Sequence, residues 1–178
     1  MSRRHISLKR KQTRIVAFQF LDEDEHVHAR SKWIPFHMIF DVKCNPTHKA
    51  QYIAGGHWME TPTQITYSSV VTWESVRIAF FIAALNELDI LAADIGNAYL
   101  QAPVSEQVHT TPSPEFGPSS QGQSVIVVRA IYGLKSSGAA WHAQLSETLY
   151  SMNFKPSLAD PDDFSTMNNY LFMLMTYS

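Results

Sequence analysis

The chain has 178 residues, of which 45% are hydrophobic and 17% charged, so it is long enough for a folded domain with a buried core. Its formal net charge of −2 excludes a strong overall field that would attract nucleic acid or a membrane. A single cysteine, Cys44, excludes an internal disulfide and favours a reducing intracellular compartment, without distinguishing cytoplasm from nucleus. The apolar runs are too short to span a bilayer as helices, so we expect no membrane partner.

Residues 1–32 form a polar N-terminal segment that we expect to be partly disordered. Every charged side chain within residues 1–14 is basic, which suits a nucleic-acid arm, a nuclear signal or a transit-like segment. A solvated tail is nevertheless the interpretation that we favour. His26 and His28 lie two residues apart, but without further ligands this spacing favours surface histidines over a metal site. Residues 33–178 are expected to form the folded unit.

A β-hairpin is predicted after this segment. Residues 34–42 are rich in strand formers, a turn follows at residues 44–48, and a second run covers residues 49–54. Lys43 and Lys49 would flank the turn, where they could bind phosphates as point charges. Two solvated edge lysines that discourage aggregation explain the same residues equally well.

A buried helix is predicted over residues 74–86, with Thr72 as its N-cap, because apolar residues surround most of its circumference. A strand is predicted next, over residues 88–95, and it carries one carboxylate, Asp94, to its end beside Gly96. An acid in this position can hold a hard cation such as Mg²⁺ together with substrate phosphates. Taken alone, Asp94 is more often a turn or cap residue.

The second half of the chain also alternates between strand and helix patterns. A loop rich in Pro, Gly and Ser covers residues 112–123, and a β-branched strand follows at residues 125–131. A turn at residues 132–138 leads into a helix with one apolar face. An Asp-Pro turn at residues 157–164 then precedes a last apolar strand at residues 170–177. The pattern indicates the α+β class.

Six sequence blocks, each unspecific alone, occur in a fixed order. They are KAQYIAGG at 49–56, YSSVV at 67–71, SVR at 75–77, DIGNAYL at 94–100, IYGLKSSGAAW at 131–141 and ADP at 159–161. Together they resemble the reverse transcriptases of Ty1/copia-type LTR retrotransposons, from about residue 34 to the C-terminus. The resemblance implies a partial right-hand polymerase, with a fingers hairpin and an incomplete palm whose antiparallel sheet is backed by helices.

The activity that this resemblance implies is RNA-directed DNA polymerisation, the transfer of a nucleotide to a primer 3′-hydroxyl. The implied partners are an RNA or DNA template–primer and dNTP, and the oligomeric state is left open. Asp94 would be the first catalytic carboxylate and, with the backbone carbonyl of Ile95, would hold two Mg²⁺ ions about 3.5–4 Å apart. Lys49 would reach the triphosphate from the fingers.

Two tyrosines and a glycine complete the implied site. Tyr99 would lie flat under the sugar of the incoming nucleotide and reject a 2′-hydroxyl by its bulk. Tyr132 and Gly133 would line the nucleotide and template side of the pocket. Core packing is the alternative role for these tyrosines and for Trp141, and it is the role that we favour for Trp141.

The sequence departs from the family pattern in two places. Gln51 stands where the family usually has an arginine, so this triphosphate contact would lack a charge. The family's Tyr-x-Asp-Asp turn follows a strand like residues 170–177, but here the chain ends at Ser178. The Asp162-Asp163 pair precedes that strand and is not taken as a substitute.

One carboxylate cannot hold two Mg²⁺ ions in octahedral geometry. We therefore expect a truncated polymerase fragment that is inactive alone. The alternative is a non-catalytic nucleic-acid-binding or non-functional remnant of a transposable element.

Overall fold

The computed structural model describes residues 16–21, 26–42, 44, 46–60, 66, 68–90, 95–165 and 171–173. Within these ranges three β-sheets and three α-helices confirm the mixed α and β composition that the sequence predicts. No helix in this part of the chain is long and apolar enough to cross a membrane.

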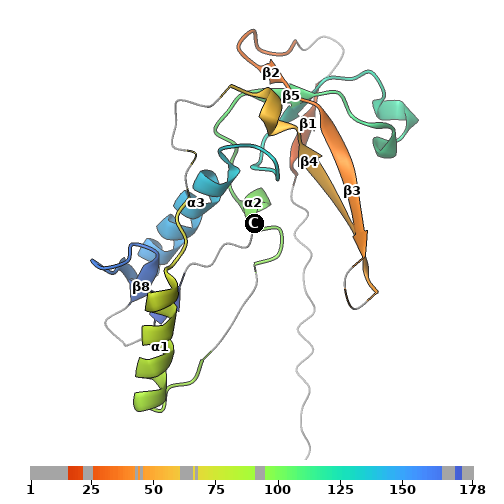
Figure 1. The fold of residues 1–178 in the computed structure, drawn as a ribbon. Coiled ribbons are helices and arrows are strands. Elements are labelled where there is room, and N and C mark those ends of the chain that lie inside the picture. The colour runs from red at the N-terminus through yellow and green to blue at the C-terminus, as the bar shows by residue number, and fades with distance from the viewer. Residues whose placement is uncertain are drawn as a thin grey trace, which may run out of the picture.

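A four-stranded sheet forms one end of the molecule (Figure 1). Its strands lie in the order β1 (Phe18–Phe20), β6 (Val125–Val127), β5 (Val108–Thr110) and β2 (Lys32–Trp33). The β1–β6 and β6–β5 pairs are antiparallel, whereas β2 and β5 are parallel, so this sheet is mixed and not antiparallel throughout. The sequence analysis did not anticipate β1.

The main hydrophobic core lies against this sheet. Its buried members are Ile34, Ala54, Met59, Val108, Val127, Ile131 and Leu134. The predicted strand at residues 125–131 ends at Val127, and its last residues turn into this core instead. The core therefore joins the sheet to the segment that leads into the next helix.

The predicted hairpin is confirmed. It consists of β3 (Phe36–Val42) and β4 (His48–Ala54), paired antiparallel, and Figure 1 shows it projecting from the sheet on the side opposite α1 and α3. Its base is packed by aromatic rings, because Phe36 and Tyr52 stack with their centroids 5.0 Å apart. Towards the turn most of its side chains are exposed, and Lys43 lies outside the described residues.

Three helices make up the rest of the described elements. They are α1 (Trp73–Leu85), α2 (Ala98–Gln101) and α3 (Ser137–Ser151). The predicted N-cap of α1 is confirmed, because the Thr72 hydroxyl accepts a hydrogen bond from the Ser75 amide at 3.2 Å. Short 3₁₀ turns lie at Gly56–Trp58 (η1), Pro114–Phe116 (η2) and Pro118–Ser120 (η3).

The prediction that α1 is a buried helix is wrong. Its buried positions are the small residues Val76, Ala79 and Ala83, which share one face. Its bulky apolar residues face solvent instead: Trp73, Ile78, Phe80, Phe81, Ile82 and Leu85. Because apolar residues occur on all sides of α1, the sequence pattern did not show that only its small side chains are buried.

A third sheet contains β7 (Lys155–Pro156), β8 (Asp163–Ser165) and β9 (Leu171–Met173), all antiparallel. The predicted last strand at residues 170–177 is represented by β9, and its other residues lie outside the described part. The residues on either side of Asp94, 88–90 and Ile95, are irregular where the sequence predicted a strand.

Candidate functional site

Two of the predicted site residues meet in the structure. The rings of Tyr99 and Tyr132 are half-buried, with their centroids 4.6 Å apart and their planes at 45°. Tyr99 lies in α2, and α2 is positioned by a hydrogen bond of 3.0 Å from the Ala130 amide to the Ala102 carbonyl. Because the Ala102 and Ala130 side chains pack with Trp141 in a small core, the predicted packing role of Trp141 is confirmed.

Gly133 brings the backbone of the Tyr132 turn against the base of the hairpin. Its φ of +93° lies in a region that other residues rarely adopt, and a Cβ there would lie 2.0 Å from the Ala54 carbonyl oxygen. A Cβ on Gly56 would lie 2.0 Å from the Gly133 carbonyl oxygen. The Ala54 amide also donates a hydrogen bond of 2.8 Å to the Tyr132 carbonyl. Only glycine allows this contact at either position.

Further hydrogen bonds fix the turn that follows Gly133. The Lys135 ammonium donates to the Met59 carbonyl at 2.7 Å, which ties the turn to the residue after η1. The Ser137 hydroxyl donates to the Ile131 carbonyl at 2.6 Å and is fully buried. The turn is therefore held at both ends, so the Tyr132 and Gly133 backbone is preorganised.

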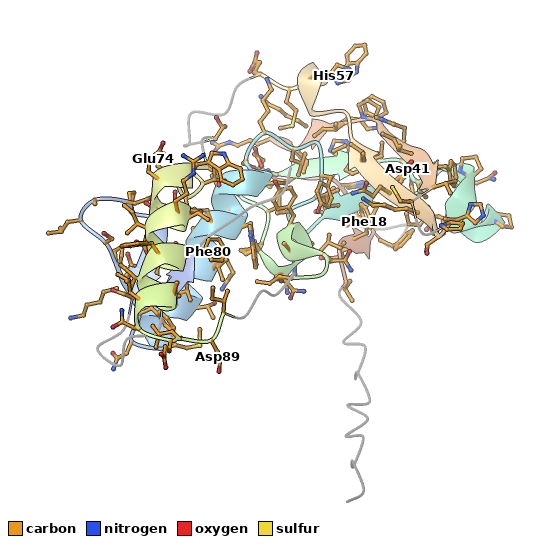
Figure 2. The ribbon with its side chains drawn as sticks, turned by 60° about the horizontal axis from the view of Figure 1, so that its bottom comes forward. Phe18, Asp41, His57, Glu74, Phe80 and Asp89 are labelled. Atoms are coloured by element: carbon orange, nitrogen blue, oxygen red, sulfur yellow. The ribbon has the colours of Figure 1, made fainter. Side chains whose placement is uncertain are left out.

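Lys49 is not brought to this place. It lies near the tip of the hairpin, opposite Asp41, and its side chain is exposed. Ala54 is five positions further along the strand, which corresponds to about 17 Å of extended chain. An open cavity of about 580 Å³ at the hairpin tip includes Lys49 in its lining, together with Phe40, Asp41, Val42, His48 and Ala50. Asp41 is labelled on this part of the hairpin in Figure 2.

Of the two expected metal ligands, only Ile95 lies among the described residues. Asp94 lies outside the described residues. Ile95 is described and is 40% exposed, just before the left-handed Asn97 that begins α2. Within the described part of the chain no group of three or more His, Cys, Asp or Glu side chains could hold a metal ion. A metal centre here would need acids from the residues not described.

A buried carboxylate that the sequence analysis did not assign connects two distant elements. Asp160 is 4% exposed, and one of its oxygens accepts hydrogen bonds from the Thr72 amide (2.9 Å) and the Ser75 hydroxyl (2.7 Å). Its other oxygen accepts from the Asp162 amide at 3.1 Å. The hydrogen bond from Ser75, followed by that from Thr72, lowers the pKa of Asp160. This acid therefore fastens the start of α1 to the turn before β8.

The environments of Asp162 and Asp163, which follow Asp160, are also set by the fold. Asp162 is buried and lies 2.5 Å from Nε2 of His142 on α3. Burial, together with the charge of Asp160, raises the pKa of Asp163. No sequence pattern links Asp160 to Thr72, which is 88 positions away. Only the fold reveals their contact.

Comparison with known proteins adds independent information. Residues 18–170 match the family model described as reverse transcriptase (RNA-dependent DNA polymerase). The chain is 31% identical over 113 residues to the truncated transposon Ty1-A Gag-Pol polyprotein of Saccharomyces cerevisiae, covering 62% of this chain and 9% of that protein. It is 30% identical over 120 residues to the retrovirus-related Pol polyprotein from transposon RE2 of Arabidopsis thaliana, covering 66% and 8%.

The chain thus spans less than a tenth of the length of these curated relatives. No solved structure matches it.

Proposed function

Because the chain belongs to the reverse transcriptase (RNA-dependent DNA polymerase) family, as a retrotransposon fragment, we propose that it carries the nucleotide side of a polymerase site. The family binds a nucleic-acid template and generally uses a divalent metal. The proposal assigns to this chain a place for the incoming dNTP and for the adjacent template–primer.

The observation that supports this proposal is the meeting of Tyr99, Tyr132 and Gly133. The two rings are in contact with their planes at 45°, so they offer two aromatic faces, one for a sugar and one for a base. Gly133 beside them lets the turn that carries Tyr132 pack against the Ala54 backbone, which holds the ring pair at the base of the hairpin. In this assignment Tyr99 lies under the sugar and excludes a 2′-hydroxyl by its bulk, while Tyr132 and Gly133 line the base and template side.

The finer right-hand assignment belongs to the same proposal. The β3–β4 hairpin is assigned to the fingers, and the sheets with their helices to an incomplete palm. Residues 33–178 would form most of this unit, and β1 from the preceding polar segment 1–32 completes its four-stranded sheet. Lys49 lies near the hairpin tip, so its contact with a triphosphate requires the hairpin to close over the tyrosine pair.

Mg²⁺ is the cation that we assign to this site, because it favours oxygen ligands and substrate phosphates. The Asp94 carboxylate and the Ile95 carbonyl are the ligands proposed from this chain. Bound there, the metal would activate the primer hydroxyl and stabilise the leaving pyrophosphate. The described residues supply no cluster of three ligating side chains, so they do not by themselves fit a two-ion centre. We propose that this fragment binds substrates without sustaining synthesis alone.

Primer extension on a labelled template–primer tests this proposal. With Mg²⁺ and dNTPs we expect binding of the template–primer that weakens steeply as salt rises, and no extension above that of the Asp94→Asn variant. Robust synthesis that depends on Asp94 would overturn the second expectation. Failure to bind a template–primer even at low salt would overturn the first.

A further inference from the structure

Two aromatic rings stand exposed on η1. The Trp58 side chain is 73% exposed, and the neighbouring His57 is exposed as well. Their ring centroids lie 5.6 Å apart with the planes at 47°. Figure 2 shows His57 projecting outward from the edge of the molecule. Two adjacent exposed rings on one short turn form an aromatic surface that a ligand can reach.

The backbone beneath these rings is held firmly. Gly56, the first residue of η1, lies directly against the Gly133 carbonyl, where a Cβ would approach to 2.0 Å. The Trp58 amide donates to the Gly55 carbonyl at 3.0 Å, and the Met59 side chain is buried in the main core. The backbone that carries the rings is therefore held immediately beside the Tyr132–Gly133 turn.

Two ammonium groups contact the two residues that follow η1, Met59 and Glu60. The Lys135 ammonium contacts the Met59 carbonyl, one residue after Trp58. The Lys32 ammonium lies 3.1 Å from a Glu60 carboxylate oxygen in an exposed pair. An exposed ion pair contributes about 0–1 kcal/mol, so Lys32 can exchange this partner for a phosphate at little cost. Aromatic rings flanked by cations are the arrangement that binds single-stranded nucleic acid.

We propose that His57 and Trp58 form a stacking platform for an unpaired base of a single-stranded nucleic acid, with Lys135 and Lys32 placed for its phosphates. The inference rests on the proposed function, because the strand that reaches this place would be the template next to the nucleotide. Stacking on an aromatic ring tolerates every base, which suits a template of any sequence. A protein partner for Trp58 is a different occupant, and the experiment below separates the two.

Anisotropy of a labelled single strand of about 12 nucleotides, a usual site length, measures this binding. The assay contains neither dNTP nor Mg²⁺ and compares RNA with DNA at low salt. A stacked base contributes about 1–3 kcal/mol, so Trp58→Ala should weaken binding roughly 5- to 150-fold. Trp58→Phe should retain part of the affinity, because it keeps a ring. Trp73→Ala removes a tryptophan of similar exposure (68%) from α1 and should bind as the unchanged protein does.

An abasic strand of equal length and charge provides the second comparison. The unchanged protein and Trp58→Ala should bind it equally, because only the phosphates remain to be recognised. If Trp58→Ala binds normal strands as tightly as the unchanged protein, or loses affinity for abasic strands to the same degree, there is no stacking platform. Because the assay needs neither nucleotide nor metal, a failed nucleotide site would leave its result intact, and a failed platform would leave nucleotide binding unaffected.

Discussion

At the scale of single residues, two glycines determine whether the hairpin can lie against the Tyr132 turn. A methyl group on Gly56 would meet the Gly133 carbonyl oxygen, which is backbone and cannot move aside cheaply. Gly56→Ala should therefore destabilise the fold by about 1–3 kcal/mol, the usual cost of forcing an extra carbon into a packed position. Urea unfolding of the purified variant measures this loss.

Gly96→Ala is the matched control for this substitution. A Cβ on Gly96 meets nothing within 4 Å, so the change should alter stability by less than about 0.5 kcal/mol. Equal losses in the two variants would show that the contact between the hairpin base and the turn does not exist in solution.

A second residue-scale prediction concerns pH. Because hydrogen bonds lower the pKa of Asp160 in the folded state, its contribution is complete above the unfolded value of 3.8 and is lost as pH falls through the folded value. Asp160→Asn should cost about 1.5–3 kcal/mol at neutral pH, as for hydrogen bonds to a charged group. This difference from the unchanged protein should shrink towards zero in acid, measured by denaturant unfolding across pH.

Asp163→Asn should change the stability of the protein in the opposite direction. The pKa of Asp163 is raised in the folded state, so its ionised form opposes folding at neutral pH and this penalty disappears as pH falls below 3.8. The variant should therefore be more stable than the unchanged protein at neutral pH. A neutral-pH loss of stability in Asp163→Asn, or a pH-independent loss in Asp160→Asn, would contradict the assigned contacts.

The sequence could predict Tyr99, Tyr132 and Gly133 as neighbours only through the resemblance, because no periodicity relates α2 to the later turn. It could place Asp160 in a turn but could not predict its hydrogen bonds, because a bond between a turn and the start of a distant helix leaves no local pattern. Trp58 was also missed, although it lies two residues after the Gly55-Gly56 pair. The proposed role of Trp58 depends on the solvent exposure of its side chain, which cannot be read from the sequence.

At the scale of elements, the local patterns were reliable and the distant pairings were not. Alternating strand formers around a turn predicted the β3–β4 hairpin, since its hydrogen bonds join neighbours in the chain. The pairing of β1 with β6 joins segments that are far apart in the sequence, so no local pattern predicts it. For α1 the apolar pattern gave a helix correctly but could not show which side chains turn inward.

The outward face of α1 has a consequence for the behaviour of the protein. Phe81 is 64% exposed, and Ile78 and Leu85 lie with it at helical spacing on the face opposite Ala79. Exposed apolar patches of this kind promote association. Phe81→Glu should therefore reduce concentration-dependent association in sedimentation velocity without lowering the unfolding midpoint.

Ala79→Glu is the control on the buried face of the same helix. It places a charge where α1 packs and should lower the unfolding midpoint. If Phe81→Glu associates as strongly as the unchanged protein, the exposed face of α1 is not the surface that drives association.

At the scale of the whole molecule, two segments converge on one turn. The continuous stretch from the hairpin base through η1 to Met59, and α2, both contact residues 132–135 through backbone or rings, although both are distant from that turn in sequence. This convergence is what a nucleotide site requires, because a ligand there is bounded by parts that cannot shift independently. The central claim is that a dNTP occupies this place.

The most direct test is the dissociation constant of a template–primer with a dideoxy-terminated primer, measured by anisotropy with Mg²⁺ as dNTP is added. No bond can form, so the result does not depend on catalysis. The complementary dNTP should tighten binding in the unchanged protein and in Tyr150→Ala, a change at an exposed tyrosine of α3, but not in Tyr132→Ala. The claim would be contradicted if the complementary dNTP did not lower the dissociation constant of the unchanged protein, or if it lowered that of Tyr132→Ala as well.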